Sequence, residues 1–101
     1  LVDILSREYR EQLTLEGLSR RLGVSRFTLS RVFSEQIGCG FPEYVNRLRL
    51  RDAEALLSDT NLSITEISYR CGFETPRTFN RAFRSQLGRT PREYRNGRGK
   101  E

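Results

Sequence analysis

The chain has 101 residues, of which 36% are hydrophobic and 31% are charged, and its formal net charge is +5. These proportions are typical of a small helical protein, and no apolar run approaches the ~20 residues that cross a bilayer. There is no histidine, and Cys39 and Cys71 form neither a metal-type nor a redox-type pair. We therefore expect a cytoplasmic protein with unpaired thiols, no metal and no cofactor. Catalysis is not expected either, because the chain lacks a glycine-rich phosphate loop and a nucleophile beside a base.

The N-terminal part is predicted to form a leading helix over residues 1–9 and then two helices separated by a tight turn. Thr14 is typical of an N-cap for the second helix, and Ser25 for the third. Gly23 suits the turn, because a residue without a Cβ adopts the left-handed backbone freely. Gly38 ends the third helix. The apolar residues recur at helical spacing: Leu15, Leu18 and Leu22, then Leu29, Val32, Phe33 and Ile37.

A longer helix is predicted over residues 42–57. It carries apolar residues on two flanks, which favours a connector packed against a unit on each side. At 1.5 Å per residue it is ~24 Å long, so it would hold the two units a fixed distance apart. One flank holds Val45, Leu48 and Leu56, and the other holds Leu50, Ala53 and Leu57.

The C-terminal part repeats the N-terminal pattern. Residues 14–24 align with 63–73, and residues 29–38 align with 79–88 after one inserted residue. Ser63 and Glu66 predict a capping box, Gly72 the turn, Thr75 and Pro76 the start of the next helix, and Gly88 its end. Thr90 and Glu93 predict a second capping box at a short closing helix. The expected fold is all-α, with seven helices in two helix-turn-helix subdomains (1–40 and 60–101) joined by a connector (41–59), together one domain.

The cationic residues are the main indication of function. Almost all of them are arginine, and Lys100 is the only lysine. The guanidinium fork matches phosphate oxygens and the O6/N7 edge of guanine. In a helix-turn-helix the second helix presents its N-terminal part to base edges. With Leu29 at the centre of the buried face, 100° per residue directs Phe27, Arg31 and Ser34 outward, and the second copy directs Arg77, Arg81 and Arg84 outward. Ser30 and Asn80 lie on the flanks.

We therefore predict base contacts for one set of side chains and phosphate contacts for another. For Phe27 two alternatives stay open, packing against a thymine methyl or folding back near Val24. Ser30 suits a base or a phosphate equally, and the helix caps could serve only as caps. The expected base contacts are Phe27, Ser30, Arg31, Arg77, Asn80 and Arg81, and the expected phosphate contacts are Ser25, Arg26, Ser34, Thr75 and Arg84.

Other arginines are expected to stay away from DNA. Arg49 lies on the flank of Val45 and one turn from Asp52, which favours a structural Arg49–Asp52 pair that fixes the connector. The basic tail of Arg92, Arg95, Arg98 and Lys100 could touch phosphates or form a frayed, solvated end.

Over residues 15–95 the sequence resembles the C-terminal DNA-binding domain of the AraC/XylS family of bacterial transcription regulators. The matching segments are SRFTLSRVF (25–33), YVNRLRLRDA (44–53), IxxIxxxCGF (64–73), FxRAF (79–83) and GxTPxxYR (88–95). The resemblance implies two units in successive major grooves, with bases read from the positions named above. Pro76 stands where the family often carries a polar reader, which puts that one contact in doubt. The resemblance also implies an effector or dimerisation domain before this one, and the start at Leu1 rather than methionine favours an excised C-terminal domain.

The leading hypothesis is thus sequence-specific duplex DNA binding for a nucleoid-associated regulator, often an activator that touches RNA polymerase. The alternative is a helical protein-interaction module whose arginines meet an acidic partner. Steep salt dependence and preference for one DNA sequence would separate the two. RNA binding is not favoured, because the chain lacks aromatics carried on strands.

Overall fold

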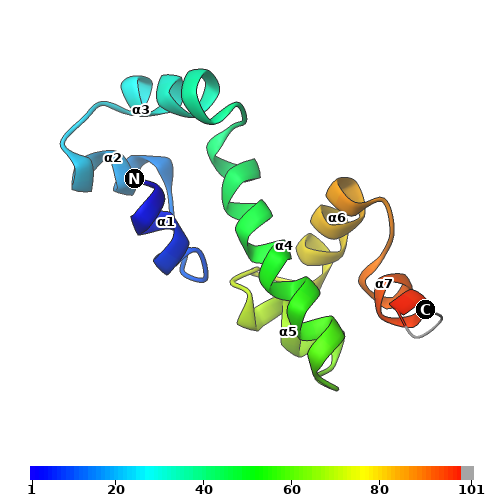
Figure 1. Ribbon diagram of the computed structural model, residues 1–101. Coiled ribbons are helices and arrows are strands. Elements are labelled where there is room, and N and C mark those ends of the chain that lie inside the picture. Colours follow the sequence, from blue (N-terminus) through cyan, green and yellow to red (C-terminus); the bar gives the residue numbers. More distant parts are fainter. Residues whose placement is uncertain (99–101) are drawn as a thin grey trace.

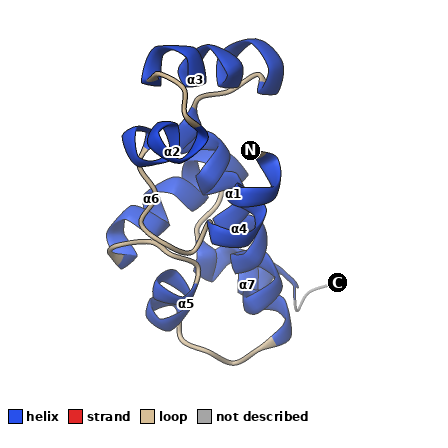
Figure 2. Ribbon diagram, turned by 90° about the vertical axis from the view of Figure 1, so that its left-hand side faces the viewer, coloured by secondary structure: helices blue, strands red, loops and turns tan. Residues whose placement is uncertain are grey.

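Helices and loops account for the whole described chain, residues 1–98 of a computed structural model (Figure 2). No strand occurs within that range, and the all-α prediction with seven α-helices is confirmed. The molecule is elongated, with extents of 47 × 22 × 22 Å. The elements are α1 (Val2–Glu8), α2 (Leu15–Leu22), α3 (Arg26–Val32), the π-helical turn η1 (Phe33–Ile37), α4 (Phe41–Asp59), α5 (Ile64–Arg70), α6 (Pro76–Leu87) and α7 (Pro91–Arg98).

The two predicted turns form with equivalent hydrogen bonds. Gly23 is left-handed at φ 71°, and the next N–H, that of Val24, donates to the carbonyl of Ser19 at 3.1 Å. Gly72 is left-handed at φ 103°, and Phe73 N–H donates to Ser68 at 3.0 Å. The repeat in the sequence therefore corresponds to a repeat in the backbone, with α2–α3 forming one helix-turn-helix and α5–α6 the other.

The end of α3, the second helix of the first helix-turn-helix, departs from the predicted α-helix. From Phe33 the chain widens into η1, and the Gly38 N–H donates to the Phe33 carbonyl five residues back at 2.7 Å. The equivalent stretch of the second unit stays α-helical to Leu87. A π-helical turn rotates each residue by less than the 100° assumed for an α-helix, so side-chain directions after Val32 shift from those predicted.

The connector α4 joins two separate cores, and Figure 1 shows it running from α3 toward α5. Val45 packs in the first core with Leu5, Leu18, Leu29 and Phe33. The second core contains the three connector residues Leu50, Ala53 and Leu57, together with Ile67, Cys71, Phe73, Phe79 and Phe83.

The prediction that α4 divides its apolar residues by flank is wrong for Leu56. This residue was grouped with Val45 and Leu48, but it packs against the second core, whereas Leu48 packs against the first. The helix divides along its length because its first half lies beside one unit and its second half beside the other.

The two predicted capping boxes differ. At α7 both hydrogen bonds form: Thr90 N–H donates to the Glu93 carboxylate at 2.8 Å, and Glu93 N–H donates to Thr90 Oγ1 at 3.1 Å. At α5 Glu66 N–H donates to Ser63 Oγ at 3.0 Å, but the Glu66 carboxylate lies 3.6 Å from Arg70 instead of returning to the cap. Among residues 1–98, no helix is both long and apolar enough to span a membrane.

Candidate nucleic-acid interface

Each recognition helix begins at a hydroxyl cap, as the sequence predicted. Ser25 Oγ accepts from the Thr28 N–H at 3.0 Å, and Thr75 Oγ1 accepts from the Thr78 N–H at 3.1 Å. In both units the two hydroxyls also lie 3.0 Å apart. The caps fix the first turn of α3 and of α6, which is the part that a helix-turn-helix presents to DNA.

The outer faces of α3 and α6 are exposed, while their inner faces are buried. Leu29 and Phe33 anchor the first recognition helix in its core, and Phe79 and Phe83 anchor the second. In Figures 1 and 2 α3 and α6 lie apart, so neither helix covers the other. All residues predicted to meet DNA are exposed in the structure: Ser25, Arg26, Phe27, Ser30, Arg31, Ser34, Thr75, Arg77, Asn80, Arg81 and Arg84.

Phe27 does not fold back onto the core. Its exposed fraction is 74%, the highest of the large hydrophobic residues that the structure leaves exposed. Of the two alternatives left open by the sequence, only the outward one agrees with this position. An apolar ring held in solvent costs free energy that burial against a ligand would recover.

The arginines on these faces are free to change partners. Arg31 Nε lies 3.5 Å from the Glu35 carboxylate, with both side chains 63% exposed, and such a pair contributes little. Within residues 1–98, Arg77 and Arg81 form no ion pair. Ser34 lies in η1 and donates its hydroxyl hydrogen to the Arg31 carbonyl at 3.3 Å, so its hydrogen is already used within its own helix.

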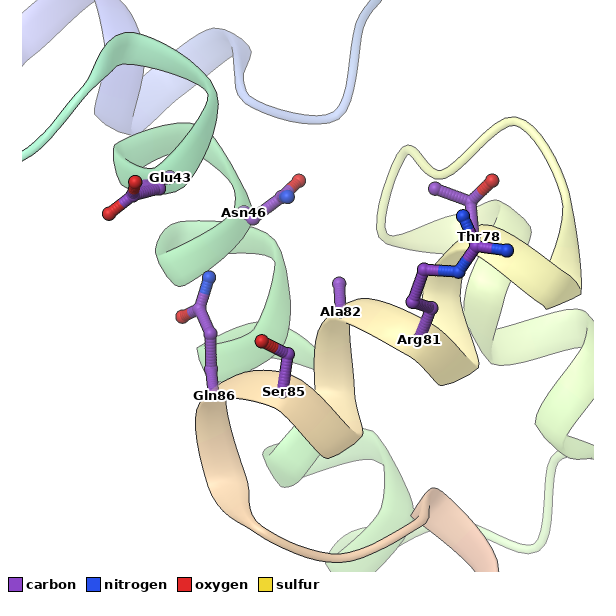
Figure 3. A pocket seen from close by; sticks show the side chains of 7 residues that line it. All are labelled: Glu43, Asn46, Thr78, Arg81, Ala82, Ser85 and Gln86. Carbon is purple, nitrogen blue, oxygen red and sulfur yellow. The ribbon is translucent and has the colours of Figure 1, made fainter.

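A groove between α4 and α6 adds residues that the sequence reasoning missed (Figure 3). Asn46 projects from the connector toward α6, and Thr78 and Arg81 border the groove from the recognition helix. Thr78 could have been found from the repeat, because it aligns with Thr28 and both share a hydroxyl pair with the cap. Asn46 aligns with Asn96 at the same offset of 50, but neither residue lies on the second helix of a helix-turn-helix, so the sequence reasoning did not mark it.

The predicted Arg49–Asp52 pair is wrong. Arg49 is half-buried as expected, but its Nε donates to the Tyr9 carbonyl at 2.6 Å and its Nη2 to the Glu11 carbonyl at 2.8 Å. Asp52 is instead bound by Arg10 at 2.8 Å. Both side chains therefore have structural roles, but toward the segment that follows α1.

The C-terminal arginines also divide. Arg95 donates three hydrogen bonds to backbone carbonyls, those of Leu57, Thr60 and Leu62. It is thus half-buried at the end of α4 and not part of a frayed end, while Arg92 is exposed. Lys100, and the side chain of Arg98, lie outside the described residues.

Known proteins with similar sequences are helix-turn-helix transcription regulators. A family model described as a helix-turn-helix domain matches residues 18–97. The transcriptional activator RhaS of Escherichia coli O139:H28 is 34% identical over 94 residues, which is 93% of this chain and 34% of RhaS. The uncharacterized transcriptional regulator YijO of Escherichia coli K12 is 36% identical over 93 residues, which is 92% of this chain and 33% of YijO. The chain thus spans about a third of the length of these relatives, which are transcription regulators.

Solved structures agree. The C-terminal domain of AraT, a response regulator from Geobacillus stearothermophilus, superposes with a TM-score of 0.89 at 32% identity, covering 94% of this chain and 79% of that one. The DNA-binding domain of AdpA, determined in complex with a target DNA, gives 0.89 at 32% identity, covering 95% and 86%. An AraC-type regulator from Chromobacterium violaceum gives 0.85 at 34% identity, covering 96% and 87%. The match of fold, duplicated turns and exposed recognition helices identifies the chain as a DNA-binding domain of the AraC/XylS family of transcription regulators.

Proposed function

We propose that the chain binds duplex DNA sequence-specifically by inserting α3 and α6 into successive major grooves. The observation that supports this most strongly is the repetition of one device: a hydroxyl-capped helix, anchored by Leu29 and Phe33 or by Phe79 and Phe83, with arginine on its outer face. A single exposed arginine is an ordinary surface residue, but an equivalent pair on two equivalent helices is what a two-site reader needs.

Within this proposal Arg31, Arg77 and Arg81 read base edges, with guanine as the preferred partner, and Phe27, Ser30 and Asn80 complete the readout. Each bidentate arginine contact discriminates against the wrong base by about 1–3 kcal/mol. The phosphate contacts are assigned to five exposed residues of α3, η1, α6 and their caps: Ser25, Arg26, Ser34, Thr75 and Arg84. For Ser34 the hydroxyl exchanges its hydrogen bond to the Arg31 carbonyl for one to a phosphate oxygen.

The test begins with selection of bound sequences from a random duplex pool, followed by titration of the selected site. Arg31→Ala should weaken binding to the selected site and flatten preference at one base position. Arg70→Ala is a matched control, because Arg70 forms an exposed pair with Glu66 at 3.6 Å, close to the 3.5 Å of Arg31 and Glu35. Unchanged preference in Arg31→Ala would contradict the assignment of α3 as a reader.

Substitution of a residue that contacts phosphate should lower affinity without changing sequence preference. Arg84→Ala should weaken all DNA sequences about equally and reduce the slope of log K against log salt by about 0.9. Arg81→Ala, in the same helix, should instead change the selected sequence. Strong DNA binding that is independent of sequence would contradict the proposal. It would favour the alternative of a helical protein-interaction module whose arginines meet an acidic partner.

We also propose that this domain works within a longer cytoplasmic, nucleoid-associated regulator that carries a second, effector-sensing or dimerisation domain. The support is the share of RhaS and YijO that the chain covers, about a third of each. By analogy with RhaS, which is named an activator, the regulator would raise transcription and contact RNA polymerase. A reporter assay with the full-length protein, with and without the selected site upstream of a promoter, tests this directly.

A further inference from the structure

The loop between α1 and α2, residues 9–13 and here called the strap, connects the two units a second time. It belongs to the first unit by sequence, yet it reaches the α5–α6 turn of the second unit (Figure 1). Gln12 Nε2 donates to the Gly72 carbonyl at 3.2 Å. A Cβ at position 72 would lie 2.7 Å from Arg10 Cα and from Arg10 O, so the two backbones touch where only glycine fits.

Arg49 of the connector binds the backbone of the strap. Its guanidinium donates to the carbonyls of Tyr9 and Glu11 at 2.6 and 2.8 Å. The same group lies 5.6 Å from the ring centroid of Phe73, in the turn of the second unit. Burial lowers the pKa of Arg49, as expected for a cation withdrawn from water. Arg49, a residue of the connector, thus contacts both the strap and the second unit.

Asp52, one turn further along α4, fixes the start of the strap. Arg10 binds its carboxylate through Nε at 2.9 Å and Nη2 at 2.8 Å, and the Tyr9 hydroxyl donates to the same oxygen at 3.2 Å. Asp52 thus accepts two hydrogen bonds and one further ion-pair contact from two neighbouring residues of the strap. Its own side chain is only 14% exposed, whereas that of Arg10 is 60% exposed, so the contact orients the strap on α4 more than it stabilises the fold.

We propose that the strap, Arg49, Asp52 and Gly72 form a lock that sets the orientation of α3 relative to α6 and thereby the half-site spacing that the chain accepts. This inference rests on the proposed function. A long helix can bend, so α4 alone would let the two units swing relative to each other. A second connection, from the strap to the turn after α5, removes that freedom.

The lock matters because DNA converts spacing into rotation. One added base pair moves a half-site by about 3.4 Å and turns it by about 34° around the duplex. A rigid pair of recognition helices cannot follow that change, whereas a loosely tethered pair can. The residues of the lock are therefore positioning residues for specificity although they touch no base.

The experiment measures affinity for the selected site and for the same site with one base pair added or removed between half-sites. The wild-type chain should lose roughly tenfold or more on either change, the loss of about one bidentate base contact. Gly72→Ala and Arg49→Met should show lower affinity at the parent spacing and less than about a threefold difference among the three spacings.

Gly88→Ala is the matched control, because Gly88 is left-handed at φ 79° but has nothing within 4 Å of its Cβ position. It should keep the wild-type spacing profile. If Gly72→Ala does not fold, Arg49→Met and Gln12→Ala carry the test. Folded variants that retain the wild-type profile, or a wild-type chain indifferent to spacing, would overturn the lock.

A second measurement needs no DNA. Spin labels at Ser30→Cys and Asn80→Cys, in a Cys39→Ser background, report the distance between α3 and α6. The lock predicts a narrow distance distribution that broadens in Arg49→Met, and equal widths would overturn it. Failure of the proposed function is recognised separately, as the absence of any preferred sequence while this distribution still broadens.

Discussion

Arg95 offers the sharpest test of the fold, because its guanidinium closes the C-terminal end of the connector. Arg95 Nη1 donates to Leu62 O at 2.7 Å, and its other nitrogens reach Leu57 O and Thr60 O, both at 3.2 Å. Leu57 lies in the last turn of α4, where carbonyls have no partner within the helix and the helix dipole favours a cation.

The substitution Arg95→Met keeps much of the apolar stem and removes all three donors. A hydrogen bond to a charged group contributes about 1.5–3 kcal/mol. Since Arg95 is only half-buried, water can replace part of what is lost, and we expect about 2–4 kcal/mol of destabilisation. For a domain of this size that lowers Tm by at least about 8 °C. Arg95→Lys should recover little, because three separate guanidinium nitrogens bind the three carbonyls and a single ammonium nitrogen cannot occupy all three positions.

The measurement is urea unfolding followed by circular dichroism, with Arg92→Met as the control from the exposed side of the same helix. Surface substitutions of that kind change stability by no more than about 0.5 kcal/mol. DNA affinity, measured well below the unfolding transition, should be unchanged in Arg95→Met. Stability equal to that of Arg92→Met, together with weaker DNA binding, would refute the structural role and support a phosphate contact.

Three further predictions concern single side chains. Burial raises the pKa of Cys71 to about 12, so iodoacetamide should alkylate the half-buried Cys39 in the folded chain and reach Cys71 only after unfolding; equal rates by mass spectrometry would contradict this. Hydrogen bonds from Thr90 lower the pKa of Glu93 below its ordinary 4.5, so the ionised carboxylate stabilises the fold above that value and the benefit is lost as pH falls through the lowered pKa. Glu93→Gln should therefore have a lower free energy of unfolding than wild type at neutral pH and the same value in strong acid. A difference in free energy of unfolding that does not change with pH would show that the Glu93 charge is not its cause. Phe27→Ala should leave unfolding unchanged and reduce preference for thymine at one position, whereas a loss of more than about 1 kcal/mol in stability would mean that the ring packs on the core.

The sequence was sufficient for the features that depend on local chemistry. Gly23 and Gly72 marked the two turns because a left-handed backbone favours glycine, and both are left-handed in the structure. The caps at Ser25 and Thr75 followed from the same reasoning. The internal repeat made these local signals reliable, since each appeared twice at equivalent positions.

Contacts between distant segments could not be predicted in the same way. Arg49 was expected to be structural, but its partners are carbonyls of Tyr9 and Glu11, about forty residues earlier in the chain. Every residue carries a carbonyl, so no pattern of residue types marks such a partner. Arg95 escaped for the same reason. The π-helical turn was missed because its apolar spacing also fits an α-helix over so short a stretch.

The connector α4 prevents either half of the molecule from folding as a separate fragment. Because Val45 completes the first core and Leu50, Ala53 and Leu57 complete the second, the helix is a structural part of both halves. A fragment that stops at Gly40 would leave a gap beside Leu29 and Phe33, and one that begins after Asp59 would lose three of its innermost side chains. Neither half could be excised and transplanted alone; a graft would have to carry the whole of α4 with it.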